Sequence, residues 1–130
     1  MIIDSSVIIA ILRNEQDARD LAVALGSEDE RRMSAASYVE ASMVIDGNRS
    51  AVLSRRFDSF LQEVQIIVEP VTIEHARLAR EAFRDFGKGR HKAGLNFGDC
   101  FVYALAKHRG EPILCKGNDF RRTDVEIFEP

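Results

Sequence analysis

The first twelve residues of the chain read MIIDSSVIIAIL (1–12) and contain the first strand and the first helix of the predicted fold. Residues 1–4 are an apolar run that ends in a carboxylate, which is the pattern of a short buried strand. Residues 5–12 predict a helix that begins directly after Asp4, despite the isoleucines. A strand followed at once by a helix is the first unit of an order that recurs along the chain.

Strands and helices alternate over the remaining residues. After the first unit, helices are expected at 15–25, 35–46, 50–64, 72–86 and 96–108, and strands at 32–34, 66–68, 112–115 and 125–128. This order implies right-handed crossovers and a mostly parallel sheet. We therefore expect an α/β fold, a three-layer α/β/α sandwich whose central sheet has four to five strands, in a single domain spanning 1–130.

The helix expected at 72–86 makes a prediction about packing. Thr72 is a candidate N-cap, and the buried face should include Ala76, Leu78 or Ala79, and Phe83.

Composition excludes several classes of protein. The chain has 130 residues, 45% of them apolar and 30% charged, as in an ordinary globular domain. Its apolar runs fall far short of the roughly 20 residues that a membrane span needs, and its N-terminus lacks the features of a secretory signal. Cys100 and Cys115 do not form a disulfide pattern and fit a reducing compartment. We expect a cytoplasmic protein with no membrane partner.

Charge is distributed unevenly along the chain. The net charge is −3, which gives no general attraction for nucleic acid. Between residues 84 and 92, however, four basic residues stand against one acidic residue, so this segment has a net charge of +3 and the rest of the chain −6. The pattern indicates two surfaces of opposite sign.

Four acidic residues fall where a parallel sheet places its chemistry, at the carboxyl ends of the strands. They are Asp4, Glu40, Asp99 and Asp119. Gathered together they would repel one another, unless a hard divalent cation such as Mg²⁺ or Mn²⁺ neutralised them. Such an ion activates water, polarises a phosphoryl oxygen and stabilises a leaving oxygen, which are the needs of phosphodiester hydrolysis.

Each of these acids also has a purely structural interpretation. Asp4 is a candidate N-cap, and Asp119 is a candidate turn residue. The spacing of Ser37 and Glu40 is that of a capping box, and Asn96 with Asp99 also suits a helix start. The two interpretations are compatible, because a carboxylate at a helix start can also bind an ion.

The same residues carry a resemblance to a known family. The segments MIIDSS (1–6), SYVE (37–40), NFGDC (96–100) and ILCKGNDF (113–120), in this order, resemble PIN-domain nucleases, particularly the VapC toxins of bacterial toxin–antitoxin pairs. Phe101 and Ala104 extend the third segment, and GKGRHKAGLN (87–96) resembles a subset of these toxins. The resemblance covers the whole chain.

This resemblance implies a function. The expected activity is that of a toxin endoribonuclease, in which Mg²⁺ or Mn²⁺ activates the water that hydrolyses RNA. It also implies a homodimer and a cognate protein antitoxin. Asp4, Glu40 and Asp99 match the acidic metal site of the family. Asp119 is the choice for its fourth position, with Asn118 as the competitor and Asp124 as a lesser candidate.

Supporting roles follow for other residues near these acids. Ser6 matches a small hydroxyl residue of the family, Asn96 opens the helix of Asp99, and Lys116 is placed to contact a phosphate or to balance the carboxylates. The basic loop is expected either to bind RNA phosphates or to be a solvated loop, and its members are Lys88, Arg90, His91 and Lys92.

Two other functions use an acidic pocket. A receiver-like regulatory domain would need an aspartate at the end of the third strand, where this chain has Glu69-Pro70. An aspartate-nucleophile phosphatase would need a second carboxylate two residues after Asp4, where this chain has Ser6. Both patterns favour the nuclease.

Overall fold

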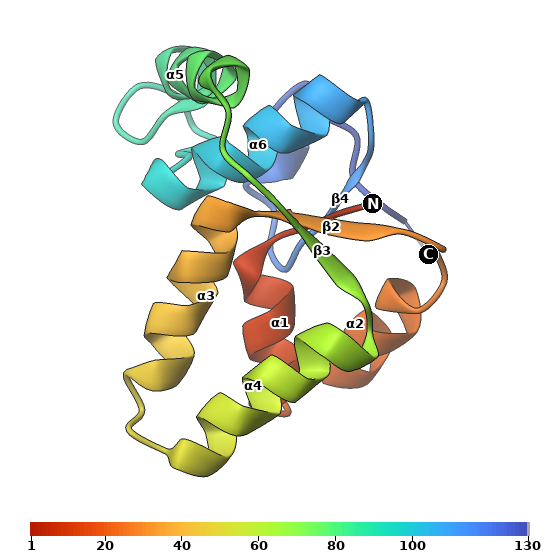
Figure 1. Cartoon of the computed structure of the whole chain (residues 1–130). Helices are drawn as coiled ribbons and strands as arrows, with labels where there is room; N and C mark the ends of the chain where they lie inside the picture. Colours follow the sequence, from red (N-terminus) through yellow and green to blue (C-terminus); the bar gives the residue numbers. More distant parts are fainter. Residues whose placement is uncertain (130) are drawn as a thin grey trace.

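A computed structural model describes residues 1–129 and contains one four-stranded sheet (Figure 1). All neighbouring strands are parallel, in the order β3-β2-β1-β4. The strands are short: β1 is Ile2–Ile3, β2 is Arg31–Ser34, β3 is Ile66–Glu69 and β4 is Ile113–Leu114. The predicted parallel sheet is confirmed.

Helices cover both faces of the sheet. The helices that connect the first three strands are α1 Ser5–Leu12, α2 Ala18–Leu25, α3 Ala35–Asp46 and α4 Ala51–Glu63. The return from β3 to β4 is made by α5 Ile73–Phe86 and α6 Phe97–Arg109. Figure 1 shows α1 to α4 on one side of the sheet and α5 with α6 on the other, as expected for three layers.

Two apolar cores form because successive residues of a strand point to opposite faces. Ile3 and Met33 pack with the layer of α1, α3 and α4. Ile2 and Ile113 pack with the layer of α5 and α6. All four of these side chains are fully buried.

The order of the strands creates a crevice beside β1. From β1 the chain proceeds to β2 and β3 on one side, and it returns across the sheet to place β4 on the other side of β1. The Asp4 amide donates to the Leu114 carbonyl at 3.0 Å, so β1 and β4 stay paired to their carboxyl ends. A reversal of this kind is where parallel α/β sheets bind ligands.

Two expected elements differ from the structure. Helix α2 begins at Ala18 rather than residue 15, because Asn14 takes a left-handed backbone conformation (φ 51°) that separates it from α1. Residues 125–128 were predicted as a strand, but only a single parallel bridge joins Ile127 to Ile113. A short 3₁₀ helix, Phe120–Arg122, precedes this segment.

The packing predicted for α5 is partly wrong. Ala76 and Phe83 are exposed, whereas His75, Ala79 and Ala82 are buried. Small residues on this face let α5 lie close against α6, and Phe83 is left at the margin. Within residues 1–129, no helix is both long enough and apolar enough to span a membrane.

Candidate active site

Asp4 stands at the carboxyl end of β1 and is the N-cap of α1. Its Oδ2 accepts the Ser6 amide at 3.1 Å and also the Ser6 hydroxyl. The carboxyl is only 6% exposed, and burial raises its pKa; the Ser6 hydrogen bonds oppose this rise and the charge of Glu40 adds to it. The capping interpretation of Asp4 is correct, and it leaves the carboxylate in the crevice.

Ser6 joins the two strands that border the crevice. Its hydroxyl donates to Asp4 and accepts the backbone amide of Lys116 at 3.1 Å, just beyond β4. The Lys116 ammonium pairs with Glu15 and lies 3.4 Å from Asp17, both in the turn between α1 and α2. These acids hold the lysine beside the crevice.

Glu40 reaches the crevice from α3. The N-cap of α3 is Ser34, which accepts the Ala36 amide at 3.1 Å, so the Ser37–Glu40 capping box is wrong. Glu40 Oε1 instead accepts the Ser5 hydroxyl at 2.6 Å. Ser5 is a buried residue that the sequence did not single out.

Asp99 lies in the first turn of α6 and forms a complete capping box. The Asn96 amide donates to Asp99 Oδ2 at 3.0 Å, and the Asp99 amide donates to Asn96 Oδ1 at 2.9 Å. Burial, together with the negative charges of Asp4, Asp119 and Glu40, raises the pKa of Asp99 to about 6, against the lowering effect of the Asn96 hydrogen bond.

Asp119 is held less firmly than the other three acids. It is exposed, it precedes the 3₁₀ helix, and its side chain caps nothing there. Asn118, its competitor for the fourth position, does not line the crevice. Asp124 accepts from the Tyr103 hydroxyl at 2.7 Å and from Lys107 at 2.6 Å, which explains it as a structural link to α6.

One hollow of about 360 Å³ brings the predicted acids together. It is lined by all four carboxylates and by the three supporting residues, namely Asp4, Glu40, Asp99, Asp119, Ser6, Asn96 and Lys116. Their chemistry is that of a cluster of oxygen donors with one ammonium group at its margin.

The donor set suits a hard divalent cation. Asp4, Glu40 and Asp99 are each held through one oxygen, and within residues 1–129 the other oxygen makes no side-chain hydrogen bond. In the same described part of the chain, no group of three or more His, Cys, Asp or Glu side chains already has an arrangement that could hold an ion. The carboxylates would therefore have to draw together around one.

The basic loop lies outside this hollow. Hydrogen bonds between the Lys88 amide and the Leu95 carbonyl (2.9 Å) and between the Leu95 amide and Phe86 close its base. Lys88, Arg90 and Lys92 are exposed, whereas the His91 ring packs edge-on against Phe86. The loop leads directly into α6, but none of its four candidate residues lines the hollow with Asp99.

A receiver-like domain would require an acid at the end of the third strand that faces the acidic hollow. Glu69, at the end of β3, forms an ion pair with Arg32 and does not line the hollow. The alternative therefore gains no support from the geometry.

Comparison with known proteins gives consistent results. The PIN-domain family matches residues 1–126. Ribonuclease VapC28 of Mycobacterium tuberculosis is 57% identical over 127 residues, which cover 97% of this chain and 96% of that protein.

Two solved structures share the fold. VapC20 of M. tuberculosis, described as a toxin that cleaves the sarcin-ricin loop, superposes with a TM-score of 0.78 at 15% identity and covers 99% of this chain and 98% of that one. A toxin–antitoxin complex from Klebsiella pneumoniae gives a TM-score of 0.75 at 13% identity, covering 98% of this chain and 95% of that one.

Proposed function

The chain belongs to the PIN-domain family, among the VapC ribonucleases, and we propose that it is a divalent-metal-dependent endoribonuclease that acts as the toxin of a toxin–antitoxin pair. The observation that carries this proposal is the convergence of Asp4, Glu40, Asp99 and Asp119 on one hollow at the carboxyl edge of the sheet. The ribonuclease activity is proposed because VapC28, which is named a ribonuclease, is similar to this chain over nearly its whole length.

The four carboxylates would hold Mg²⁺ or Mn²⁺. When bound, such an ion lowers the pKa of water and stabilises the charge on a transferring phosphoryl group. Oxygen ligands and room for water are what these ions require, and the hollow of about 360 Å³ offers both.

The side chains around the acids orient them. Ser6 fixes Asp4, Ser5 fixes Glu40, and Asn96 fixes Asp99, each through the hydrogen bonds of a helix start. Orientation before the substrate arrives reduces the reorganisation that the reaction requires. Lys116, held at the margin by Glu15 and Asp17, is placed to contact an RNA phosphate.

The basic loop is proposed as a second contact for RNA. Lys88, Arg90, His91 and Lys92 belong to the segment of positive charge that precedes α6. Phosphate contacts by lysine and arginine give affinity without sequence specificity. The loop leads directly into α6, whose first turn carries Asp99 of the hollow.

A protein antitoxin is the proposed partner in the cell, where the ribonuclease would act in the cytoplasm. The support is the family of the chain and the structural similarity to a toxin–antitoxin complex. Co-expression with the product of the neighbouring upstream reading frame, followed by purification of a stable complex that no longer cleaves RNA, would establish this partner.

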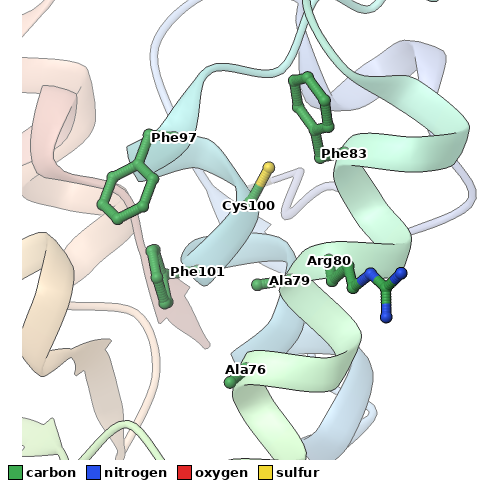
Figure 2. A pocket seen from close by; sticks show the side chains of 7 residues that line it. All are labelled: Ala76, Ala79, Arg80, Phe83, Phe97, Cys100 and Phe101. Atoms are coloured by element: carbon green, nitrogen blue, oxygen red, sulfur yellow. The ribbon is translucent and has the colours of Figure 1, made fainter.

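A homodimer is proposed because of an apolar face formed by Val39, Met43, Phe83 and Phe97. Met43 is 71% exposed and Phe97 79% exposed. Large apolar side chains gathered on the surface of a monomer usually mark an interface. The Glu40 carboxylate of α3 lies against Gly98 of α6, so the helices that carry Val39, Met43 and Phe97 are in contact. Figure 2 shows Phe97 and Phe101 of α6 next to each other and Phe83 of α5 on the other side of Cys100; all of them line a hollow of about 420 Å³.

Light scattering coupled to gel filtration tests the homodimer. The double variant Met43→Glu/Phe97→Glu should be monomeric, because it would bury two charges in the interface. Val23→Glu is a matched control, since Val23 is equally exposed but lies on α2. A dimer that survives the double variant would contradict this assignment of the face.

An RNA cleavage assay tests the proposed function. Cleavage should require Mg²⁺ or Mn²⁺, should stop on chelation, and should be lost in Asp4→Asn and Asp99→Asn while both variants stay folded. Asp58→Asn, an exposed acid on α4, should cleave normally. Cleavage that is independent of metal, or full activity in both site variants, would contradict the proposal.

A further inference from the structure

We propose that Gly98 is a positioning residue for Glu40. Its missing side chain provides the space in which the Glu40 carboxylate rests on the first turn of α6, and Ser5 holds the same carboxylate from α1. The catalytic consequence of this role rests on the proposed function, whereas the geometric role does not.

The space beside Gly98 is filled by one group. An ideal Cβ on Gly98 would lie 2.0 Å from Glu40 Oε2, 2.7 Å from Glu40 Cδ and 2.9 Å from Glu40 Oε1. All three nearest atoms belong to a single carboxylate, and all three distances are shorter than real side chains tolerate. Even a methyl group at position 98 would therefore require Glu40 to move.

The backbone gives no other reason for glycine at this position. Gly98 is the second residue of α6, and its φ does not lie in the left-handed region that favours glycine. Within a helix, glycine is less stable than alanine, because it loses more conformational freedom on folding. The chain accepts this local loss of stability at a buried position where the neighbouring carboxylate needs the room.

Glu40 gains a defined environment from this arrangement. The first turn of any helix has amide groups without intrahelical acceptors, and a negative charge placed there is stabilised. Glu40 lies on the first turn of α6 and accepts from Ser5, the first residue of α1, at 2.6 Å. Because α1 and α6 cover opposite faces of the sheet, one carboxylate joins the two layers at the hollow.

A thermal-unfolding cycle without added metal tests the geometric role. Gly98→Ala should be less favourable for the Tm in the wild-type background than in the Glu40→Ala background, because the methyl group displaces the Glu40 carboxylate from its hydrogen bond with Ser5. In the Glu40→Ala background the same substitution should leave the Tm unchanged or raise it, as alanine does in an unobstructed helix. Equal changes in the two backgrounds would overturn the proposal.

Gly26→Ala is the matched control for this cycle. A Cβ on Gly26 would meet only Ala22 and Val23 carbonyls at 3.6 and 3.7 Å, which is ordinary contact. Its effect on the Tm should therefore be small and the same with or without the Glu40 side chain. If Gly98→Ala does not fold by itself, recovery of folding in the Glu40→Ala background supports the proposal, and failure to recover contradicts it.

RNA cleavage tests the catalytic consequence. Gly98→Ala should lower kcat by about 100-fold, the effect of displacing a reacting geometry by about 1 Å. Gly98→Ala/Glu40→Asp should cleave faster than Gly98→Ala, since aspartate is one methylene shorter and vacates the space. No rescue would show that Gly98 does not act through Glu40 in the reaction. Because the unfolding cycle uses no RNA, failure of the proposed function would be seen separately.

Discussion

Three of the four carboxylates in the hollow are fixed by helix starts, and the fourth is not. Asp4, Glu40 and Asp99 accept hydrogen bonds from Ser6, Ser5 and Asn96 at the starts of α1 and α6. Asp119 stands on an exposed turn, without a capping hydrogen bond from its side chain. The difference separates a preorganised part of the site from an adjustable part.

The fixed part holds its charges together at a cost in stability. Burial and mutual repulsion raise the pKa of both Asp4 and Asp99, which shows that their ionised forms are disfavoured in the folded protein. A cation that binds only the folded state would offset this cost and stabilise the fold. Asp119 also contributes to the repulsion at Asp99, but no capping hydrogen bond holds its side chain, so it can move toward such an ion.

The largest effect is expected from the fixed part. Asp4→Asn should lower RNA cleavage by about 1,000-fold or more, since a ligand charge that supports transition-state stabilisation of several kcal/mol is lost. Cleavage rates at saturating Mn²⁺, with circular dichroism to verify folding, provide the measurement. A folded Asp4→Asn enzyme that retains a tenth of the wild-type rate would remove Asp4 from the centre of the site.

A smaller effect is expected from the adjustable part. Asp119→Asn should lower cleavage by about tenfold, mainly by raising the metal concentration needed, because the remaining three acids still hold the ion. Rates measured over a range of Mn²⁺ concentrations test this. Asn118→Ala is the control, and a greater loss from Asn118→Ala than from Asp119→Asn would reverse the assignment of the fourth position.

The charge of Asp99, in the fixed part, should also affect the stability of the metal-free protein. The pKa of Asp99 is about 6 when folded and 3.8 as its ordinary value. The folded state therefore binds more protons between these values, and the free energy of unfolding falls as the pH rises through them. Asp99→Asn should raise the free energy of unfolding by about 1–2 kcal/mol at about pH 7.5, after allowance for solvent screening.

Urea denaturation at about pH 4 and about pH 7.5 measures this effect. Most of the gain from Asp99→Asn should disappear at the lower pH, where the wild-type carboxyl is protonated in the folded state and partly protonated in the unfolded state. An equal gain at both values would mean that the substitution acts through packing rather than charge.

The smallest effect is expected outside the hollow, in the basic loop. Lys88→Ala should weaken RNA binding by a few-fold. It should also reduce the slope of log K against log salt concentration by the amount expected for about one phosphate contact. Arg19→Ala, an exposed cation on α2, is the control. An unchanged salt dependence in Lys88→Ala would identify the loop as solvated surface.

The order of strands and helices predicted the residues around the hollow better than local motifs did. Helices 5–12 and 35–46 were predicted with their observed bounds: Asp4 precedes the first as a candidate cap, and apolar residues recur at helical spacing in the second before Gly47. The Ser37–Glu40 motif was misleading, since Ser34 caps the helix one turn earlier. Which of two nearby serines caps the helix depends on where the chain leaves β2. The spacing of residues in the sequence does not give this information.

What the sequence could not provide was contact between distant segments. Ser5 and Gly98 are 93 positions apart in the numbering, yet both touch Glu40. Phe83 was expected in the core, but the close approach of α5 to α6 through Ala79 and Ala82 leaves it at the surface. One modest signal was present for Gly98, namely a glycine inside the first turn of a predicted helix, where alanine would be more stable.

Diffraction from crystals grown with Mn²⁺ would locate the proposed ion. An anomalous peak should appear in the hollow, with oxygens of Asp4, Asp99 and Glu40 directed toward it and with Asp119 moved closer than in the metal-free protein. A peak elsewhere on the molecule, or no peak at a Mn²⁺ concentration that supports RNA cleavage, would mean that these carboxylates do not hold the ion.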